Sequence, residues 1–180
     1  MQDSSDEVLT RAIEGDEAAF SMLYQENVKK IYNYIYYRTG NSGDAEDLTA
    51  RVFQRALKHI TRYHKTNVPF SAWLYRIAHN LVANWHRDNQ RRKEVPIEEH
   101  IYLHSKHDIP DIEIEKKQEI EFLLNAVHRL PGDRQTLIIL KYVEDLSNKE
   151  IGEIMNKSEG AIKSLYHRTL MDLRDYFERK

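Results

Sequence analysis

Four polar side chains near the C-terminus could bind DNA. Lys163, Ser164, His167 and Arg168 share one face of a segment with helical spacing. Side chains of these types reach phosphates and the edges of bases. We therefore take the four residues as candidate contacts to the major groove. A helical hairpin with a merely solvated polar face is the alternative that this stretch leaves open.

The segment that must position them, from Ser147 to Leu173, is typical of a helix-turn-helix. Ser147 followed by Glu150 is a capping box that starts a first helix. The chain turns at Asn156-Lys157 and a second helix starts at Ser158. In this motif the second helix can lie in the major groove. Apolar residues at helical spacing should form its buried face: Ile151, Ile154, Met155, Ile162, Leu165, Tyr166, Leu170 and Leu173.

A second polar group flanks an apolar stripe that runs from Phe70 to Trp85. Away from the stripe lie Arg76, His79, Asn80, Asn84 and Arg87. Asparagine can read the edge of adenine or cytosine, and arginine binds phosphate with two hydrogen bonds. In the preceding loop, Tyr63, His64 and Phe70 could stack an unpaired base. Single-strand binding and an ordinary core helix with a hydrated face are both open from this stretch alone.

Three carboxylates, Asp44, Glu46 and Asp47, open another predicted helix. Acids in a first turn complement the helix dipole and cap its N–H groups, which explains them without a functional role. No neighbouring group marks one of them as a general acid or base. The sequence also has no glycine-rich phosphate loop, nucleophile elbow or HExxH motif. We therefore expect no enzymatic activity.

Histidines at helical spacing, His100, His104 and His107, lie beside Glu99 and Asp108 and could bind zinc. Their segment has little helical periodicity and no apolar residues to hold a rigid site. We expect a solvated linker with no metal and no cofactor, although the sequence leaves metal binding by these histidines open.

The composition is that of a protein with packed cores, because 41% of its 180 residues are hydrophobic and 31% are charged. No apolar run approaches the roughly 20 residues of a membrane-spanning helix, and the polar, acidic N-terminus excludes a signal peptide. The absence of cysteine excludes disulfides. We expect a cytoplasmic protein that does not insert into membranes.

The net charge of −2 hides a segregation of charge along the chain. Four cations lie close together at Arg87, Arg91, Arg92 and Lys93. The following segment, 94–121, holds nine acids against three lysines. Local fields rather than the net charge decide where a polyanion docks, so this pattern is compatible with DNA binding.

Helical periodicity runs through nearly the whole chain, and strand alternation is absent. We predict an all-α fold of two small helical domains, 1–93 and 111–180, joined by a flexible acidic linker, 94–110. The charged composition and weak periodicity typical of the linker already begin at Asn89. The expected helices are 4–14, 16–38, 44–60, 70–88, 111–130 and 136–143, followed by the helix-turn-helix. Residues expected in the core of the first domain are Phe20, Leu23, Tyr24, Val28, Ile31, Tyr34, Ile35, Leu48, Val52, Phe53, Ala56 and Leu57.

These segments together resemble the extracytoplasmic-function (ECF) sigma factors, the small two-domain specificity subunits of bacterial RNA polymerase. Residues 44–57 are similar to the helix that docks on the polymerase clamp. Residues 70–80, FSAWLYRIAHN, resemble the promoter-melting helix. Residues resembling the C-terminal helix-turn-helix are Leu130-Pro131, Leu146-Ser147, Glu150-Ile151, Gly160–Ser164 and His167-Arg168.

The resemblance implies a factor that binds core RNA polymerase, recognises a two-part promoter and helps to open it, without catalysis of its own. The residues implied to face the polymerase clamp are Asp44, Glu46, Asp47 and Gln54. Those implied to bind the −10 element are Asn80, Tyr63 and His64 around a flipped base, and Arg76, Arg87, Arg91 and Arg92 on phosphates. Those implied to contact the −35 element are Lys163, Ser164, His167 and Arg168. The acidic linker would thread polymerase channels built for nucleic acid. Members of the family often have an anti-sigma partner, and we expect one here.

The sequence departs from the family pattern in two places. Ala50-Arg51 stands where the family usually has Gln-Glu, so we expect a weaker or rearranged clamp contact. Ala161 and Leu165 lack the usual hydroxyl and guanidinium, and Tyr166 replaces an aliphatic residue, so we expect an unusual −35 sequence.

Two other classes of protein compete with this reading. A dimeric helix-turn-helix regulator would bind DNA without polymerase, but it leaves the Trp73–Asn80 segment unexplained. A helical adaptor would show no salt-dependent affinity for DNA.

Overall fold

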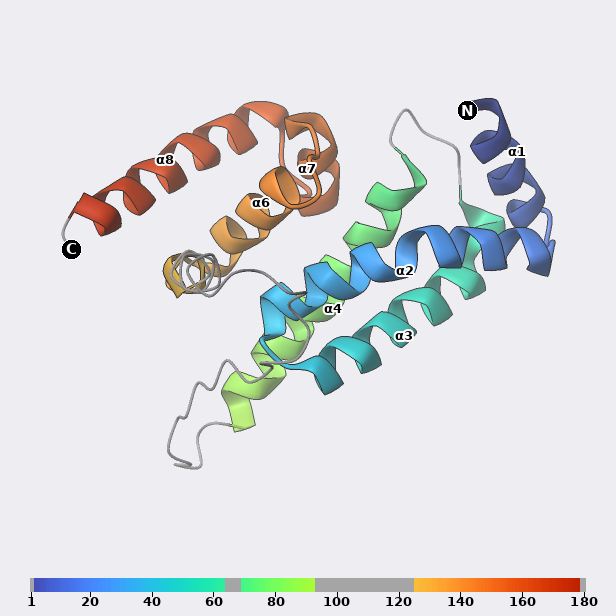
Figure 1. The fold of residues 1–180 in the computed structure, drawn as a ribbon, viewed down its shortest axis with the longest axis horizontal. Helices are drawn as coiled ribbons and strands as arrows, with labels where there is room; N and C mark the ends of the chain where they lie inside the picture. The colour runs from blue at the N-terminus through green and yellow to red at the C-terminus, as the bar shows by residue number, and fades with distance from the viewer. Residues whose placement is uncertain (1, 64–68, 93–124, 179–180) are drawn as a thin grey trace, which may run out of the picture. The chain divides into compact units, whose positions relative to one another are not determined.

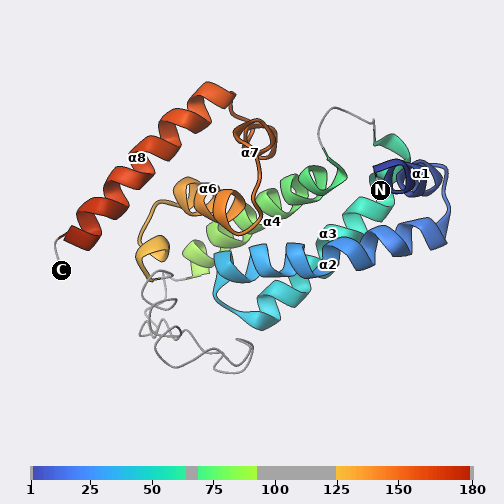
Figure 2. The same cartoon turned by 45° about the horizontal axis from the view of Figure 1, so that its top comes forward.

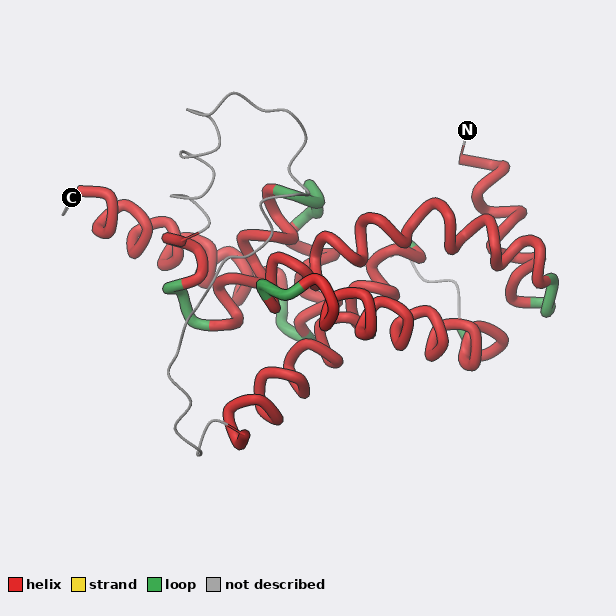
Figure 3. The backbone as a smooth tube through the Cα atoms, turned by 60° about the horizontal axis from the view of Figure 1, so that its bottom comes forward, coloured by secondary structure: helices red, strands yellow, loops and turns green. Residues whose placement is uncertain are grey.

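The computed structural model describes residues 2–63, 69–92 and 125–178. Within these ranges the regular elements are all helices, and Figure 3 shows them joined by short loops. The chain separates into two compact units, Met1–His100 and Ile101–Lys180, which are treated individually below (Figure 1). The predicted all-α, two-domain fold is therefore confirmed. The linker predicted at 94–110 lies outside the described residues, and its limits stay a prediction.

The described residues of the first unit, 2–63 and 69–92, form five helices. They are α1 (Gln2–Ile13), α2 (Glu17–Thr39), α3 (Ser42–His59), the short 3₁₀ helix η1 (Ile60–Arg62) and α4 (Phe70–Arg92). The long helix α2 packs on both α3 and α4, while α1 packs on α2 and η1 (Figure 2). This arrangement leaves one outer side of α3 and one of α4 facing solvent.

Local capping groups set the ends of α2 and the start of α3. The Asp16 carboxylate accepts hydrogen bonds from the Ala18 and Ala19 N–H groups at 2.9 and 3.1 Å. Gly40 ends α2 in the left-handed region at φ 67°, which glycine adopts without steric cost. The side-chain oxygen of Asn41 then accepts from the Asp44 N–H at 2.9 Å and caps α3. The helix therefore begins at Ser42, and our prediction that Asp44 starts it was wrong.

Two other predicted boundaries shift outward. Helix α1 begins at Gln2 instead of Ser4, and α4 continues through Asn89 to Arg92. The extension of α4 has a physical reason, because glutamine and arginine are good helix formers and cations stabilise the last turn. The segment from Asn89 that we assigned to the linker is thus helical as far as Arg92, so that part of the prediction was wrong.

The core of the first unit forms where α2, α3 and α4 meet. Ile31, Tyr34 and Ile35 are fully buried, as their helical spacing predicted. The Tyr34 ring meets the Tyr75 ring edge-on with centroids 5.6 Å apart, and its hydroxyl lies 3.4 Å from His79 Nδ1. These contacts fix the rotation of α4, so that its polar side faces outward.

Two residues expected in this core are exposed instead. Tyr24 is 42% exposed and Leu57 is 53% exposed. The buried stripe of α2 passes through Leu23 and Asn27, so Tyr24 lies about 100° around the helix and covers only the edge of Phe53. Leu57 is likewise one position beyond the buried Ala56. The apolar sequence pattern is wider than the surface that the neighbouring helices cover.

A smaller cluster lies under α1. Its buried residues are Leu9, Ala12, Ala19, Leu23 and Ile60. Tyr63 and Phe70, which lie on either side of residues 64–68, pack against the edge of this cluster. Helix α1 therefore supports the chain both before and after that segment.

The second unit contains α6 (Gly132–Tyr142), α7 (Asn148–Met155) and α8 (Glu159–Glu178), and residues 125–128 are also helical. Each of the three helices packs on the other two. Ion pairs join Arg134 to Asp172, and Lys157 Nζ to an Asp133 carboxylate oxygen at 3.1 Å. The fully buried residues at the centre are Leu137, Leu140, Ile151, Ile154 and Ile162. The helix predicted at 136–143 begins earlier, at Gly132, and ends at Tyr142. The helix predicted over 111–130 falls mostly outside the described residues.

One residue of the predicted α8 stripe was assigned to the wrong face. Leu170 is 39% exposed, whereas Thr169 is fully buried and donates its hydroxyl to the Leu165 carbonyl at 2.7 Å. The internal hydrogen bond satisfies the Thr169 hydroxyl, which lets a polar residue occupy the core position. None of the helices in the described ranges combines the length and apolarity that crossing a membrane requires.

Candidate nucleic-acid and partner interfaces

Capping hydrogen bonds set the helix ends of the helix-turn-helix, and the sequence predicted these caps. The Ser147 N–H donates to the Glu150 carboxylate at 2.7 Å, and the Glu150 N–H donates to Ser147 Oγ at 3.3 Å. Asn156 ends α7 in the left-handed region at φ 55°. Ser158 Oγ then accepts from the Ala161 N–H at 3.2 Å and starts α8. The predicted capping box and turn are confirmed.

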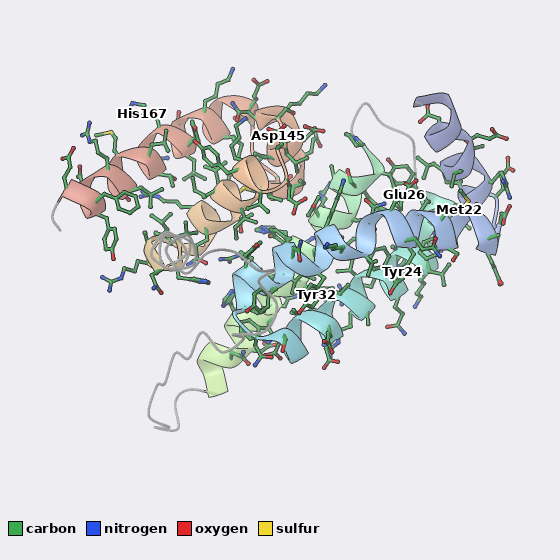
Figure 4. All side chains as sticks on the ribbon, viewed as in Figure 1. Met22, Tyr24, Glu26, Tyr32, Asp145 and His167 are labelled. Atoms are coloured by element: carbon green, nitrogen blue, oxygen red, sulfur yellow. The ribbon has the colours of Figure 1, made fainter. Side chains whose placement is uncertain are left out.

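The exposed face of α8 carries the four candidate DNA contacts. Lys163, Ser164, His167 and Arg168 are all exposed, and His167 is marked in Figure 4. The opposite side of the helix buries Ile162 and Thr169. Arg168 Nε donates to the Ser164 carbonyl at 3.3 Å, which leaves its other guanidinium nitrogens available to a ligand. The structure thus brings the four residues onto one solvent-facing surface.

An acidic residue that our sequence reasoning missed lies on the same surface. The Glu159 carboxylate and the Lys163 ammonium form an ion pair at 2.9 Å, one turn apart. Hydrogen bonding and charge from Lys163 lower the pKa of Glu159 below its usual value. The spacing of four residues between an acid and a lysine was a signal available in the sequence.

Tyr166, one of the residues that departs from the family pattern, bonds to a neighbouring helix. Its hydroxyl forms a hydrogen bond with the Tyr142 hydroxyl of α6, and this bond raises the pKa of Tyr142. Tyr166 therefore ties α8 to α6 at the edge of the exposed face.

Three of the candidate −10 contacts form a row along α4. Arg76, Asn80 and Arg87 are exposed, while Tyr75, Ala78 and Val82 on other sides of the helix are buried. One Arg87 guanidinium nitrogen donates to the Asn84 side-chain oxygen at 2.9 Å. The row presents an amide between two cations, which suits a nucleotide whose base and phosphates are bound together.

Tyr63 lies in an aromatic cluster at the start of the same helix. Its ring centroid is 5.6 Å from Phe70 and 5.1 Å from Trp73. Burial raises the pKa of Tyr63, and the nearby Asp6 carboxylate adds to that effect. Trp73 and Asn80 are seven residues apart, or about 10 Å along the helix. The cluster therefore adjoins the polar row at a distance comparable to a few stacked bases.

The candidate clamp contacts lie on the outer side of α3. Glu46, Asp47 and Gln54 are exposed, and Asp44 is half-buried. Because residues three, four and seven positions apart share a helix face, Asp47, Arg51 and Gln54 form one row. The acidic surface is thus interrupted by the arginine that departs from the family pattern.

Three large apolar side chains on α2 and α3 are exposed. Leu57 lies on α3, and Tyr24 and Met22 lie on α2, where Figure 4 labels them. Met22 is 46% exposed, similar to Tyr24. Leu57 lies three positions after Gln54 and therefore shares its face of α3, whereas Met22 and Tyr24, two positions apart, lie on different sides of α2.

Several predicted site residues lie outside the described part of the chain or at its edge. His64 and the three histidines His100, His104 and His107 lie outside the described residues. Arg91 and Arg92 belong to the last turn of α4. Among the residues that the structure does describe, no three His, Asp or Glu side chains lie close enough together to hold a metal ion.

Family models match both units. A model described as Sigma-70 region 2 matches residues 23–92, which include α3 and α4. A model described as Sigma-70, region 4 matches residues 121–173, which include the helix-turn-helix. Each candidate interface therefore falls inside a matched segment.

Curated relatives extend the match over most of the chain. The ECF RNA polymerase sigma factor SigW of Bacillus subtilis (strain 168) is 33% identical over 168 residues, which cover 89% of this chain and 89% of SigW. The ECF RNA polymerase sigma factor BldN of Streptomyces coelicolor is 36% identical over 167 residues, 93% of this chain. The chain spans only 63% of the length of BldN.

Solved structures share the fold. CnrH, in a complex with the cytosolic domain of CnrY, superposes with a TM-score of 0.72 at 16% identity and covers 96% of each chain. RpoE of Bartonella quintana, in a complex with the anti-sigma factor NepR, gives a TM-score of 0.70 at 18% identity, with 88% of this chain covered and 96% of RpoE. At these identities the likeness describes the fold alone.

Proposed function

This chain belongs to the extracytoplasmic-function (ECF) family of RNA polymerase sigma factors, and from that premise we propose how its surfaces divide the work of transcription initiation. One face of α3 binds core polymerase, the polar row of α4 binds the −10 element, and the exposed face of α8 binds the −35 element. The chain contributes binding and positioning and carries out no catalytic step.

The observation that supports this proposal best is the row Arg76, Asn80 and Arg87 on α4. It lies within the region 2 match, and buried residues such as Tyr75, Ala78 and Val82 anchor α4 in the core. Opening a duplex requires that an extruded base be captured, because unstacking and unpairing cost a few kcal/mol. An exposed asparagine flanked by arginines supplies a hydrogen-bonding edge for the base and charge for its phosphates. Arg91 and Arg92 continue the basic sequence beyond this row.

The aromatic cluster has a supporting role in the same site. Tyr63 is packed against Phe70 and Trp73, so only part of its ring is available to a base. We propose that the cluster forms one wall of the base pocket and that His64 in the adjoining loop contributes to it. The cluster also stiffens the start of α4, which keeps Asn80 in place when DNA docks.

On α3 the proposed polymerase contacts are Asp44, Glu46, Asp47 and Gln54. An acidic patch suits a basic partner surface, and the exposed Leu57 beside it would be covered in the complex. Arg51 within the row reduces the charge complementarity. We therefore propose a clamp contact that depends more on apolar packing than the family pattern implies.

The remaining partners follow from the same role. Promoter DNA is the ligand of α4 and α8, where Lys163, Ser164, His167 and Arg168 bind the −35 element. An anti-sigma factor would act by covering these faces, and a protein that works on RNA polymerase resides in the cytoplasm. A dimeric regulator acting without polymerase is not favoured, because it gives no reason for a region 2 match over residues 23–92.

The test is Asn80→Ala in a reconstituted polymerase complex. The variant should bind core polymerase normally but open promoter DNA far less, because the extruded base loses its hydrogen-bonding partner. Opening is read by permanganate footprinting of unpaired thymines, and binding by pull-down with core polymerase. Gln25→Ala, which removes an exposed amide from α2, is the matched control and should behave as wild type.

Unchanged opening by Asn80→Ala would overturn the base-capture role. Loss of polymerase binding in the same variant would place Asn80 in the polymerase interface instead. Failure of the wild-type chain to bind core polymerase would overturn the assignment of all three surfaces.

A further inference from the structure

We propose that Glu159 and Lys163 together read one G·C base pair of the −35 element, with Glu159 as the residue that selects cytosine. The inference rests on the proposed function, because it assumes that α8 enters the major groove of promoter DNA. It adds a residue that determines specificity and names the base pair that this residue prefers.

The two side chains form one exposed unit at the start of α8. The Lys163 ammonium lies 2.9 Å from a Glu159 carboxylate oxygen, and the side chains are 63% and 50% exposed. Glu159, Lys163 and His167 follow each other at four-residue spacing, so they form one exposed row that begins beside the buried stripe of Ile162 and Thr169. Nothing in the second unit's core requires a charge at either position.

The position suits contact with bases. In a helix-turn-helix the N-terminal residues of the second helix are those that reach base edges. Glu159 is the first residue of α8 and Lys163 is one turn further on. A carboxylate at this place repels phosphates, so it weakens binding to DNA in general unless a particular base compensates it.

The chemistry of the pair matches one base pair better than the others. In the major groove guanine offers the acceptors N7 and O6, while cytosine offers the N4 amino donor. The Lys163 ammonium donates hydrogen bonds and the Glu159 carboxylate accepts them, so together they complement the acceptors of guanine and the donor of cytosine. Guanine and thymine present acceptors that repel a carboxylate. Adenine has a donor, but its N7 acceptor lies beside that donor.

A purely structural role for Glu159 would have a different consequence. An acid in the first turn stabilises a helix through the dipole. Removing it would weaken α8 and would lower the affinity for every DNA sequence by the same factor. A change in base preference at a single position is therefore the measurement that separates the two roles.

The experiment uses the full chain bound to core polymerase and a promoter library with a randomised −35 element. Wild type should prefer G·C at one position by about 5- to 150-fold over the other pairs, the range measured for a good side-chain contact to a base. Glu159→Ala should abolish the preference for cytosine there and leave the other positions unchanged. Glu159→Gln should shift the preference toward adenine, because a glutamine amide matches adenine N6 and N7.

The matched control is Glu178→Gln at the other end of the same helix. Glu178 also forms a four-residue pair, with Arg174 at 3.7 Å, and lies about 28 Å from Glu159 along α8. This variant should keep the wild-type base preferences. Lys163→Ala should weaken the preference for guanine in the same base pair that Glu159 reads.

Three results would overturn the inference. If both Glu159 variants lower the affinity for every library member equally, the carboxylate only stabilises the helix start. If wild type selects a −35 element and both variants select the same one, the inference fails while the proposed function stands. If wild type selects no −35 element at all, the proposed function of α8 fails as well.

Discussion

Gly152 in α7 is the position where one added methyl group should disrupt the helix-turn-helix. A Cβ atom built there would lie 2.6 Å from the Lys157 carbonyl oxygen and 3.7 Å from the Glu159 nitrogen. The Gly152 carbonyl also accepts hydrogen bonds from the Asn156 and Lys157 N–H groups, the latter at 2.9 Å. The turn between α7 and α8 therefore wraps closely over this glycine.

The expected effect of Gly152→Ala is a loss of about 2 kcal/mol in the free energy of unfolding of the second unit. A carbon and an oxygen tolerate an approach of about 3.3 Å, so the turn must move by roughly 0.7 Å. Overpacking of this kind costs about 1–3 kcal/mol, and straining two hydrogen bonds pushes the cost to the upper end. The better helix propensity of alanine returns about 1 kcal/mol.

Gly160→Ala is the matched control because nothing lies within 4 Å of a Cβ atom at Gly160. This variant should gain about 0.5–1 kcal/mol, since alanine is favoured over glycine inside a helix. Hydrogen exchange of the full chain, followed by mass spectrometry of peptides from α6 to α8, reports the second unit separately. Gly152→Ala should speed exchange of its protected amides about 30-fold, the equivalent of about 2 kcal/mol. Slower exchange in both variants would refute the close-approach argument.

Four further variants test other parts of the structure. Asp145→Gly should raise the free energy of unfolding by about 0.5–1 kcal/mol, measured by urea denaturation, because Asp145 has a φ of 51° that glycine adopts without strain. Ser147→Ala should cost about 1 kcal/mol in the same assay by removing the cap of α7. The Ala19 N–H and the Arg11 guanidinium lower the pKa of Asp16, so its stabilising effect should be present above pH ~4 and vanish as the pH falls through that lowered pKa. Asp16→Asn should abolish this pH dependence in acid titrations followed by circular dichroism. Arg168→Ala should weaken binding to the −35 element by about 1–3 kcal/mol more than binding to unrelated DNA, as measured by fluorescence anisotropy.

The sequence predicted the features that depend on neighbours along the chain. The capping box of Ser147 and Glu150 and the break around Gly40 involve residues no more than a few positions apart. The grouping of Arg76, Asn80 and Arg87 follows from the helical period alone. These features need no knowledge of how the helices pack.

Features that depend on packing were predicted less well. Tyr24 and Leu57 are apolar and at nearly correct spacing, but the width of the buried face is set by how α2 and α3 cross. Asn41 caps α3 although Asp44 is an equally good cap by residue type, because the Asn41 side-chain oxygen reaches the Asp44 N–H three residues further on. The placement of the Tyr63 ring also depends on packing, because it contacts Phe70 and Trp73 in a cluster supported by α1.

The segregation of charge explains how a chain with net charge −2 can serve two partners of opposite sign. The proposed polymerase surface on α3 carries Glu46 and Asp47, whereas the proposed DNA surface on α4 carries Arg76 and Arg87. At physiological ionic strength, exposed charges further apart than about 8 Å are largely screened from each other. A docking polyanion therefore responds to the row on α4 and only weakly to the acids on α3. The same screening limits the range over which Glu159 acts. We expect its carboxylate, one turn from Lys163, to affect the bases that α8 approaches and to have little effect on more distant phosphates.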